Sequence, residues 1–166
     1  MTSRNTKRIF IGIDPGISGA VVAIGADLRV LALGDTPTLK TGGKTLYDVA
    51  EMAALLRRFC LMGEALVVLE TAQPMPKQGV TSTFSTGFGY GLWCGILSAL
   101  EISYRTVKPS VWTRDVLKGC SGEGKERSVA FIMQMFPGVE LVLPGCKKPR
   151  DGRADALALA YWGVKS

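Results

Sequence analysis

Arg8-Ile9-Phe10-Ile11-Gly12-Ile13-Asp14 is the stretch of sequence that decides the fold, and Pro15-Gly16 follows it directly. Its continuous apolar run predicts a buried β-strand, because a half-exposed strand would alternate apolar and polar side chains. The Pro-Gly pair predicts a turn that ends the strand. Two further apolar runs, residues 20–24 and 28–33, predict strands joined by a short turn near Ala26-Asp27. These three segments together predict an antiparallel meander.

The remaining segments predict helices alternating with strands. Helical spacing of apolar residues predicts helices at residues 48–60, 88–100, 110–117, 125–136 and 151–164. Apolar runs at residues 66–70 and 103–107 predict two more strands, and residues 71–86, rich in Pro, Gly, Ser and Thr, predict a loop. This order indicates a single α/β domain over residues 1–166, with a mixed five-stranded sheet flanked by helices.

The composition limits the class of protein and of site. The net charge of +6 favours a polyanionic partner, although a protein that is merely basic is an equally good reading of charge alone. The chain has no histidine, and its four cysteines lack metal-ligand spacing, which argues against a zinc finger and against histidine acid–base catalysis. The apolar stretch at residues 88–100 is too short to span a bilayer. The first strand begins too near Met1 for a signal peptide, so we expect a cytoplasmic protein.

Two acidic residues follow predicted buried strands. Asp14 ends the first strand, and Glu70 ends the strand at residues 66–70. Each also has a structural reading, because Asp-Pro-Gly is a good turn and a polar residue commonly emerges at a strand end. Neither acid is decisive by itself.

Two further acids lie on one face of the last predicted helix. Asp151 and Asp155 are four residues apart, so their carboxylates point to the same side. Asp151 could simply cap the helix, and both acids favour its positive N-terminal end. However, like charges at this spacing repel each other, and Asp155 lies in an Ala-Leu helix that should be packed almost all round. Acids in such a position require a cation.

These four carboxylates suit one type of chemistry. Mg²⁺ prefers hard oxygen ligands and needs only a few carboxylates besides water and substrate phosphates, and Mn²⁺ accepts similar ligands. Two such ions would orient a water for in-line attack on a phosphodiester and stabilise the leaving oxygen. The residues therefore predict an acidic two-metal site formed by Asp14, Glu70, Asp151 and Asp155.

Several motifs resemble those of the RuvC-like Holliday junction resolvases. The resemblance covers the chain from end to end and is strongest for the phage members and the chloroplast resolvase of plants. It rests on residues 11–19, 68–70 and 152–158, and for that branch also on residues 73–79, 87–93, 95–97, Pro109-Ser110, Trp112, Lys125, Ser128 and Phe136-Pro137.

The resemblance implies an RNase H-like fold, a homodimer, and two-metal hydrolysis that makes paired symmetric nicks across a four-way DNA junction in a bacterial host cell. Asp14, Glu70 and Asp155 match acids of the family. Bacterial members space their last two acids by three residues, whereas the chloroplast branch has a histidine and a glutamate at a spacing of four. Asp151 keeps the spacing of four and stands in the histidine position.

Basic and aromatic residues complete the predicted site. Lys125 resembles a lysine that contacts DNA near the cleaved phosphate, and Lys108 is a weaker candidate. In the loop after Glu70, Lys77 and Gln78 are expected to touch DNA, and Phe84 or Met75 to wedge against bases, although packing of Phe84 onto the domain is equally good. A basic cluster flanks the acidic helix and consists of Lys147, Lys148, Arg150 and Arg153. We expect it to bind phosphates; the alternative is that these residues form a solvated face without a partner.

Three other functions remain to be weighed. A sugar-kinase or actin-like ATPase begins with a similar strand but needs two such domains, and this chain has no second copy. A junction-binding protein with a dead site would have no reason to keep four acids. A nuclease of broad specificity, acting on branched DNA or RNA–DNA hybrids with the same acidic site, is the closest alternative.

Overall fold

A mixed five-stranded sheet forms the centre of the computed structural model, which describes residues 7–74, 79–120, 122 and 124–166, apart from the side chain of Lys125. The strands are β1 (Arg8–Ile13), β2 (Ala20–Gly25), β3 (Val30–Asp35), β6 (Glu64–Glu70) and β7 (Tyr104–Val107), arranged in the order β3-β2-β1-β6-β7. The pairs β1–β2 and β2–β3 are antiparallel, whereas β1–β6 and β6–β7 are parallel. The predicted mixed sheet with an antiparallel meander is confirmed.

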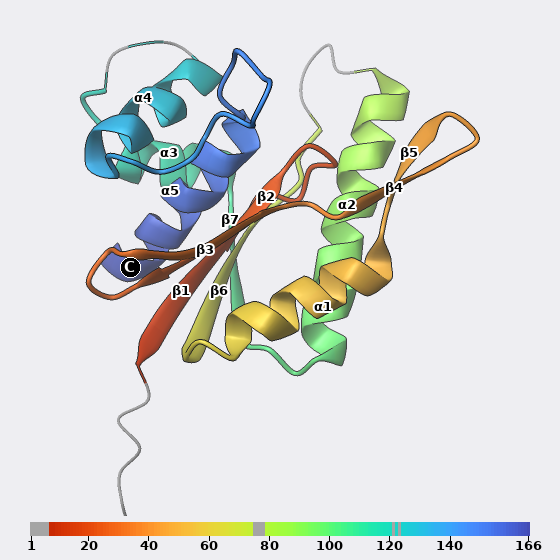
Figure 1. Ribbon diagram of the computed structural model, residues 1–166, viewed down its shortest axis with the longest axis horizontal. Helices are drawn as coiled ribbons and strands as arrows, with labels where there is room; N and C mark the ends of the chain where they lie inside the picture. Colours follow the sequence, from red (N-terminus) through yellow and green to blue (C-terminus); the bar gives the residue numbers. More distant parts are fainter. Residues whose placement is uncertain (1–6, 75–78, 121, 123) are drawn as a thin grey trace, which may run out of the picture.

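Helices cover both faces of this sheet (Figure 1). One face packs against α1 (Val49–Cys60) and α2 (Val80–Ala99), and the other against α3 (Pro109–Val116), α4 (Lys125–Met135) and α5 (Asp151–Lys165). The two apolar cores are separated by the alternation along β1, where Ile9, Ile11 and Ile13 belong to the core beneath α1 and α2 and Phe10 to the other. Among the described residues, no helix combines the length and apolarity needed to cross a membrane.

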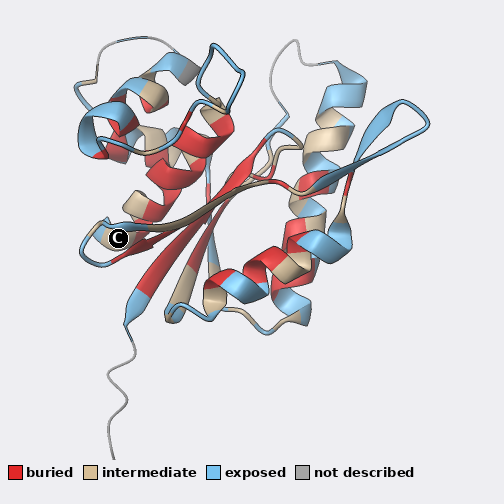
Figure 2. Cartoon of the chain, in the orientation of Figure 1, coloured by how far each residue is buried: buried red, intermediate tan, exposed pale blue. Residues whose placement is uncertain are grey.

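Helix α5 lies directly on the central strand. A methyl group at Gly12 of β1 would collide with the backbone oxygen of Ala156 and would lie 2.5 Å from the backbone nitrogen of Ala160. Only glycine permits this approach, which brings the helix backbone onto the sheet. Figure 2 shows β1, β2 and the inner turns of α5 as the most buried elements.

Two predicted boundaries were wrong, and one element was missed. The third strand is at Val30–Asp35 instead of residues 28–33, because Leu28 takes a positive φ of 65° in the turn. Helix α2 begins at Val80, within the predicted loop of residues 71–86. A hairpin of β4 (Thr38–Thr41) and β5 (Lys44–Tyr47) was not predicted; it projects beside α2 and is largely exposed (Figures 1 and 2).

Candidate functional site: an acidic cavity at the sheet edge

Two of the predicted acids leave neighbouring parallel strands at the same edge of the sheet. Ile13 of β1 pairs with Leu69 of β6, so Asp14 and Glu70, the residues that follow them, lie side by side. Both side chains are partly exposed, although the strand residues before them are fully buried. The parallel pairing of β1 and β6 is therefore what brings two acids, far apart in sequence, to one place.

The first turn of α5 returns to this edge from the other end of the chain. A methyl group at Gly152 would lie 2.5 Å from the backbone oxygen of Ser18 and 3.0 Å from Oδ2 of Asp14. Within residues 151–160, every residue is buried except Asp151 and Asp155, which are partly exposed. The helix thus packs almost all round, as expected, and only its acidic face stays open.

All four acids line one cavity of about 580 Å³. Its other walls come from the turn after β1, the segment after β6, and the starts of α3 and α4. A larger cavity of about 690 Å³, between β3 and the loop after α4, has a single carboxylate in its lining, that of Glu140. The cavity with the four acids is therefore the one whose donor groups suit a metal ion, and the role of these acids as ligands stays a prediction.

Hydrogen bonds and a helix end orient the acids. The indole Nε1 of Trp112 donates to Oε2 of Glu70, and the backbone N–H of Gly16 donates to Oδ1 of Asp14 over 3.1 Å. Asp151 and Asp155 lie in the first two turns of α5, where the partial positive charge of the helix end favours negative side chains. The protein thus offsets part of the repulsion among the four carboxylates.

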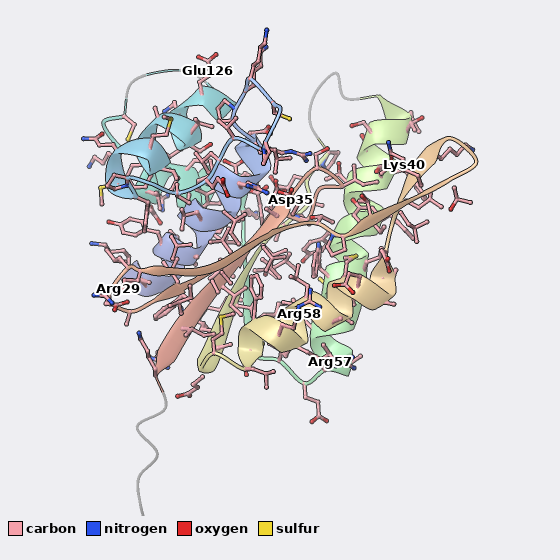
Figure 3. All side chains as sticks on the ribbon, viewed as in Figure 1. Arg29, Asp35, Lys40, Arg57, Arg58 and Glu126 are labelled. Carbon is pink, nitrogen blue, oxygen red and sulfur yellow. The ribbon has the colours of Figure 1, made fainter. Side chains whose placement is uncertain are left out.

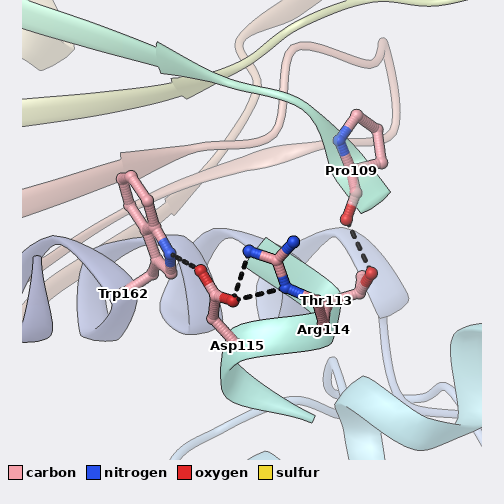
Figure 4. A network of polar contacts seen from close by, with 5 residues as sticks. All are labelled: Pro109, Thr113, Arg114, Asp115 and Trp162. Atoms are coloured by element: carbon pink, nitrogen blue, oxygen red, sulfur yellow. Dashed lines mark hydrogen bonds and ion pairs between the residues drawn. The ribbon is translucent and has the colours of Figure 1, made fainter. Parts of the chain in front are cut away.

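Helix α3 carries Trp112, and the C-terminal end of α3 is fixed to α5 (Figure 4). The indole Nε1 of Trp162 on α5 donates to Oδ2 of Asp115 over 3.1 Å, and the guanidinium of Arg114 bonds the other oxygen of that carboxylate. Both hydrogen bonds lower the pKa of Asp115, and the one from Trp162 has the larger effect. The contact holds α3 in the position from which Trp112 reaches Glu70.

The donor set fits Mg²⁺ or Mn²⁺, but it is not a closed cage. Within the described part of the chain, no three side chains of the metal-ligating types come together closely enough to hold one ion. Mg²⁺ in nucleotide-processing sites is usually held by one or two carboxylates, with water and substrate phosphates as its other ligands. Two ions could accordingly bind here, each held by two of the four carboxylates. The substrate would complete the coordination shell of each ion.

One residue of the cavity was missed by the sequence analysis. Arg127 of α4 is the only cation among the described residues that line the cavity. Its side chain is half-buried, and Nη2 donates to the backbone oxygen of Leu117 over 2.7 Å. Its position between Lys125 and Ser128, both marked by the family resemblance, was the available signal. Its Nε is buried, so a phosphate in the cavity would bind the N–H groups that remain at the end of the guanidinium.

The other predicted DNA-binding residues have different surroundings. Lys108, Lys147 and Lys148 are exposed, and Arg150 is half-buried just before α5. Phe84 lies on α2 rather than in a loop, is 73% exposed, and stacks on Phe88 with ring centroids 6.0 Å apart. The others lie outside the described residues: Met75, Lys77, Gln78 and the side chain of Lys125.

Arg153 does not belong to the exposed basic cluster. Its side chain is only 10% exposed, and its Nε donates to Oδ1 of Asp35 over 2.7 Å while Nη1 donates to the backbone oxygen of Glu140 over 2.7 Å. Figure 3 shows Asp35 at the end of β3, on the side where α5 begins. The predicted phosphate contact was wrong for this residue, because its charge is neutralised inside the protein.

Comparisons with known proteins identify the fold. No family model and no curated protein matches the chain. The structure of T. thermophilus RuvC in complex with a Holliday junction substrate is similar, with a TM-score of 0.64 and 20% identity over 92% of this chain and 90% of that one. A second Thermus thermophilus RuvC structure gives a TM-score of 0.53 and 18% identity over the same shares. The chain therefore has the RNase H-like α/β fold found in RuvC.

Proposed function

We propose that this chain, as one nuclease domain over residues 1–166, is a metal-dependent endonuclease that resolves four-way DNA junctions by paired symmetric nicks. The observation that carries the proposal is the convergence of Asp14, Glu70, Asp151 and Asp155 on one cavity at the carboxyl edge of an RNase H-like sheet. The sequence motifs shared with RuvC-like resolvases support the same substrate class.

The four acids would hold two Mg²⁺ ions, or Mn²⁺ in their place. Bound ions of this kind supply the Lewis-acid chemistry of in-line phosphodiester hydrolysis. Glu70, held by Trp112, and Asp14, held by the Gly16 amide, would keep their carboxylates oriented before the substrate arrives. Arg127 lies in the same cavity and would bind the phosphate that the acids alone would repel.

Cations around the cavity would bind the DNA arms. Lys147 and Lys148 lie in the loop that ends at α5, and Lys108 lies between β7 and α3, so all three flank the acidic edge. Exposed lysines at such positions bind phosphates without reading the sequence of the bases. Lys125, Lys77 and Gln78 are proposed as further contacts. The exposed ring of Phe84 offers a stacking surface for an unpaired base.

Paired nicks require two active sites related by a two-fold axis, which a homodimer provides. The outer face of α2 is suited to this contact. Gly87, Gly91 and Gly95 recur at one helical spacing, are exposed, and would have no atom within 4 Å of an added Cβ. Such a row lets a second helix approach closely. We therefore propose that two copies of the chain pair through α2.

The decisive experiment measures nicking in Mg²⁺ on a four-way junction, a flap, a duplex and an RNA–DNA hybrid of matched length. The expected result is two symmetric nicks in the junction and slow or no cleavage of the other three. Asp14→Asn should abolish cleavage and leave junction binding largely intact, because it removes a ligand charge without changing the size of the side chain. Binding is measured in Ca²⁺, so that cleavage does not interfere.

Two results would contradict the proposal at different levels. Equal rates on all four substrates would replace junction resolution by a nuclease of broad specificity. Cleavage by Asp14→Asn at the wild-type rate would show that the acidic site is not the catalytic site. Neither result depends on the choice of metal, since Mn²⁺ can be tested in parallel.

A further inference from the structure

The turn that carries Asp14, residues 14–19, is held between two helices. On one side it contacts the first turn of α5 at Gly152, as described above. On the other side it contacts α2, where a methyl group at Gly89 would lie 2.5 Å from the backbone oxygen of Pro15. The side chain of Tyr47 completes this second contact. Tyr47 is not among the predicted site residues.

Tyr47 joins three elements through one hydroxyl group. It is the last residue of β5, and the residue is only 8% exposed. Its Oη is 3.3 Å from the backbone oxygen of Pro15 and 3.3 Å from the backbone oxygen of Ser85 on α2. A phenol has one proton, so it must share the proton between these two acceptors or donate to one at a time. The hydroxyl thus ties the Asp14 turn to α2.

Packing leaves this hydroxyl little freedom. The ring of Tyr47 lies 6.0 Å from that of Phe88, and a methyl group at Gly89 would collide with the phenol oxygen. Burial raises the pKa of Tyr47, and the nearby charge of Asp14 raises it further, whereas an interaction with the side-chain hydroxyl of Ser85 lowers it. The group therefore remains protonated, and remains a donor, at any neutral or mildly basic pH.

The contact acts on the backbone next to a proposed metal ligand. Pro15 follows Asp14 directly, and the turn is closed by hydrogen bonds from the Gly16 amide to Oδ1 of Asp14 and from the Gly19 amide to the backbone oxygen of Gly16. A shift at Pro15 would therefore move the Asp14 carboxylate. Catalysis that depends on ligand placement is sensitive to displacements of well under 1 Å.

We propose that Tyr47 is a positioning residue, which fixes Asp14 for catalysis by tying its turn to α2. This inference rests on the proposed nuclease function. It also links that turn to the helix proposed to contact DNA and the second subunit, since Phe84 and the exposed glycines belong to α2. A displacement of α2 on binding would be passed to Asp14 through the Tyr47 hydroxyl.

Tyr47→Phe tests the proposal, because it removes the hydroxyl and keeps the ring. The matched control is Tyr161→Phe, which removes the same group from a partly buried tyrosine packed against Phe131 and Phe136, at the far end of α5. For each variant we would measure the single-turnover cleavage rate, the junction Kd in Ca²⁺, the melting temperature, and amide hydrogen exchange at Gly16 and Gly19.

Tyr47→Phe is expected to slow cleavage roughly tenfold, the equivalent of one hydrogen bond of about 1.4 kcal/mol, with an unchanged Kd. Exchange at Gly16 and Gly19 should become several-fold faster, and Tyr161→Phe should change neither quantity. Gly89→Ala is a second route to the same loss, since its methyl group would push Tyr47 and Pro15 apart.

Equal rates and equal exchange in Tyr47→Phe and Tyr161→Phe would overturn the proposal, and so would a fall in melting temperature without a fall in rate. If the wild-type protein nicks no DNA at all, the proposed function fails instead. In that case the exchange measurement alone decides whether Tyr47 positions the Asp14 turn.

Discussion

Gly152→Ala tests whether the close contact between α5 and the Asp14 turn matters for catalysis. The added methyl group would lie 2.5 Å from the backbone oxygen of Ser18, 2.8 Å from Cα of Gly19 and 3.0 Å from Oδ2 of Asp14. Two of these three atoms belong to the backbone, so a side-chain rotation cannot relieve the collision. The turn and the helix must separate, by an amount on the order of 1 Å, and Asp14 must move relative to Asp151 and Asp155.

Two magnitudes follow for this substitution. Overpacking of a buried position costs about 1–3 kcal/mol of folding free energy, and replacing glycine within a helix returns up to about 1 kcal/mol. The net loss of stability should therefore be about 0–3 kcal/mol. A displacement of this size in a catalytic ligand can slow the reaction about 100-fold, which corresponds to about 2.7 kcal/mol in the activation free energy.

Gly163→Ala is the matched control on the same helix. Its methyl group would lie 2.8 Å from Cγ2 of Val68 and 3.4 Å from Cδ1 of Phe10, so it also overpacks the contact of α5 with the sheet, but at the far end of the helix. Urea unfolding measures the stability of both variants, and cleavage of a pre-bound junction, started with Mg²⁺, measures their rates. A wild-type rate for Gly152→Ala, or an equal loss for Gly163→Ala, would refute the reasoning.

Two other substitutions separate the exposed basic cluster from the buried arginine. Lys148→Ala should weaken binding to all DNA and reduce the slope of log K against log salt by about one phosphate contact; an unchanged slope would make this lysine part of a solvated face. Arg153→Met should lower the free energy of unfolding by about 3 kcal/mol, because it leaves the Asp35 carboxylate without its buried partner. A loss below about 1 kcal/mol would show that water replaces the guanidinium.

The elements that the sequence analysis placed well are those with one dominant signal. The buried runs of β1 and β6 allow a single reading, and so does the Ala-Leu pattern of α5. Helix α2 is different, because its first eight residues include three threonines, two serines and a glycine and no strong helix former. Contacts that no local pattern contains stabilise that part of the helix, such as the packing of the Tyr47 ring against Phe88 and the hydrogen bond from the Tyr47 hydroxyl to the backbone oxygen of Ser85.

The missed hairpin did have a local signal. Gly42 and Gly43 both take positive φ, of 56° and 75°, which is the conformation of a tight hairpin turn, and Leu39 and Leu46 pair across it. A Gly-Gly pair between alternating residues is typical of such a turn. The omission mattered for function, since Tyr47 stands at the end of this hairpin and its role was hidden with it.

The convergence of the acids could be inferred, whereas the surroundings of Arg153 were misread. Asp151 and Asp155 share a face because their spacing is close to one helical turn. Arg153 is two residues from each, and residues at that spacing do not face each other. Helical geometry therefore places it opposite the acids, toward β3, where Asp35 binds it. The linear cluster of basic residues concealed this, because proximity in sequence was taken for proximity on the surface.

Glycine makes this arrangement possible, and it costs stability in the helix or strand that contains it. In a sequence-based prediction the same glycines appear only as residues of low helix or strand propensity. Within a strand or a helix, each glycine gives up as much as about 1 kcal/mol relative to alanine. Gly12, Gly89 and Gly152 all lie where a methyl group would strike a neighbouring backbone. Together they let α5 and α2 close on the turn that carries Asp14. These three glycines thus mark the contacts by which segments distant in sequence meet around the acidic cavity.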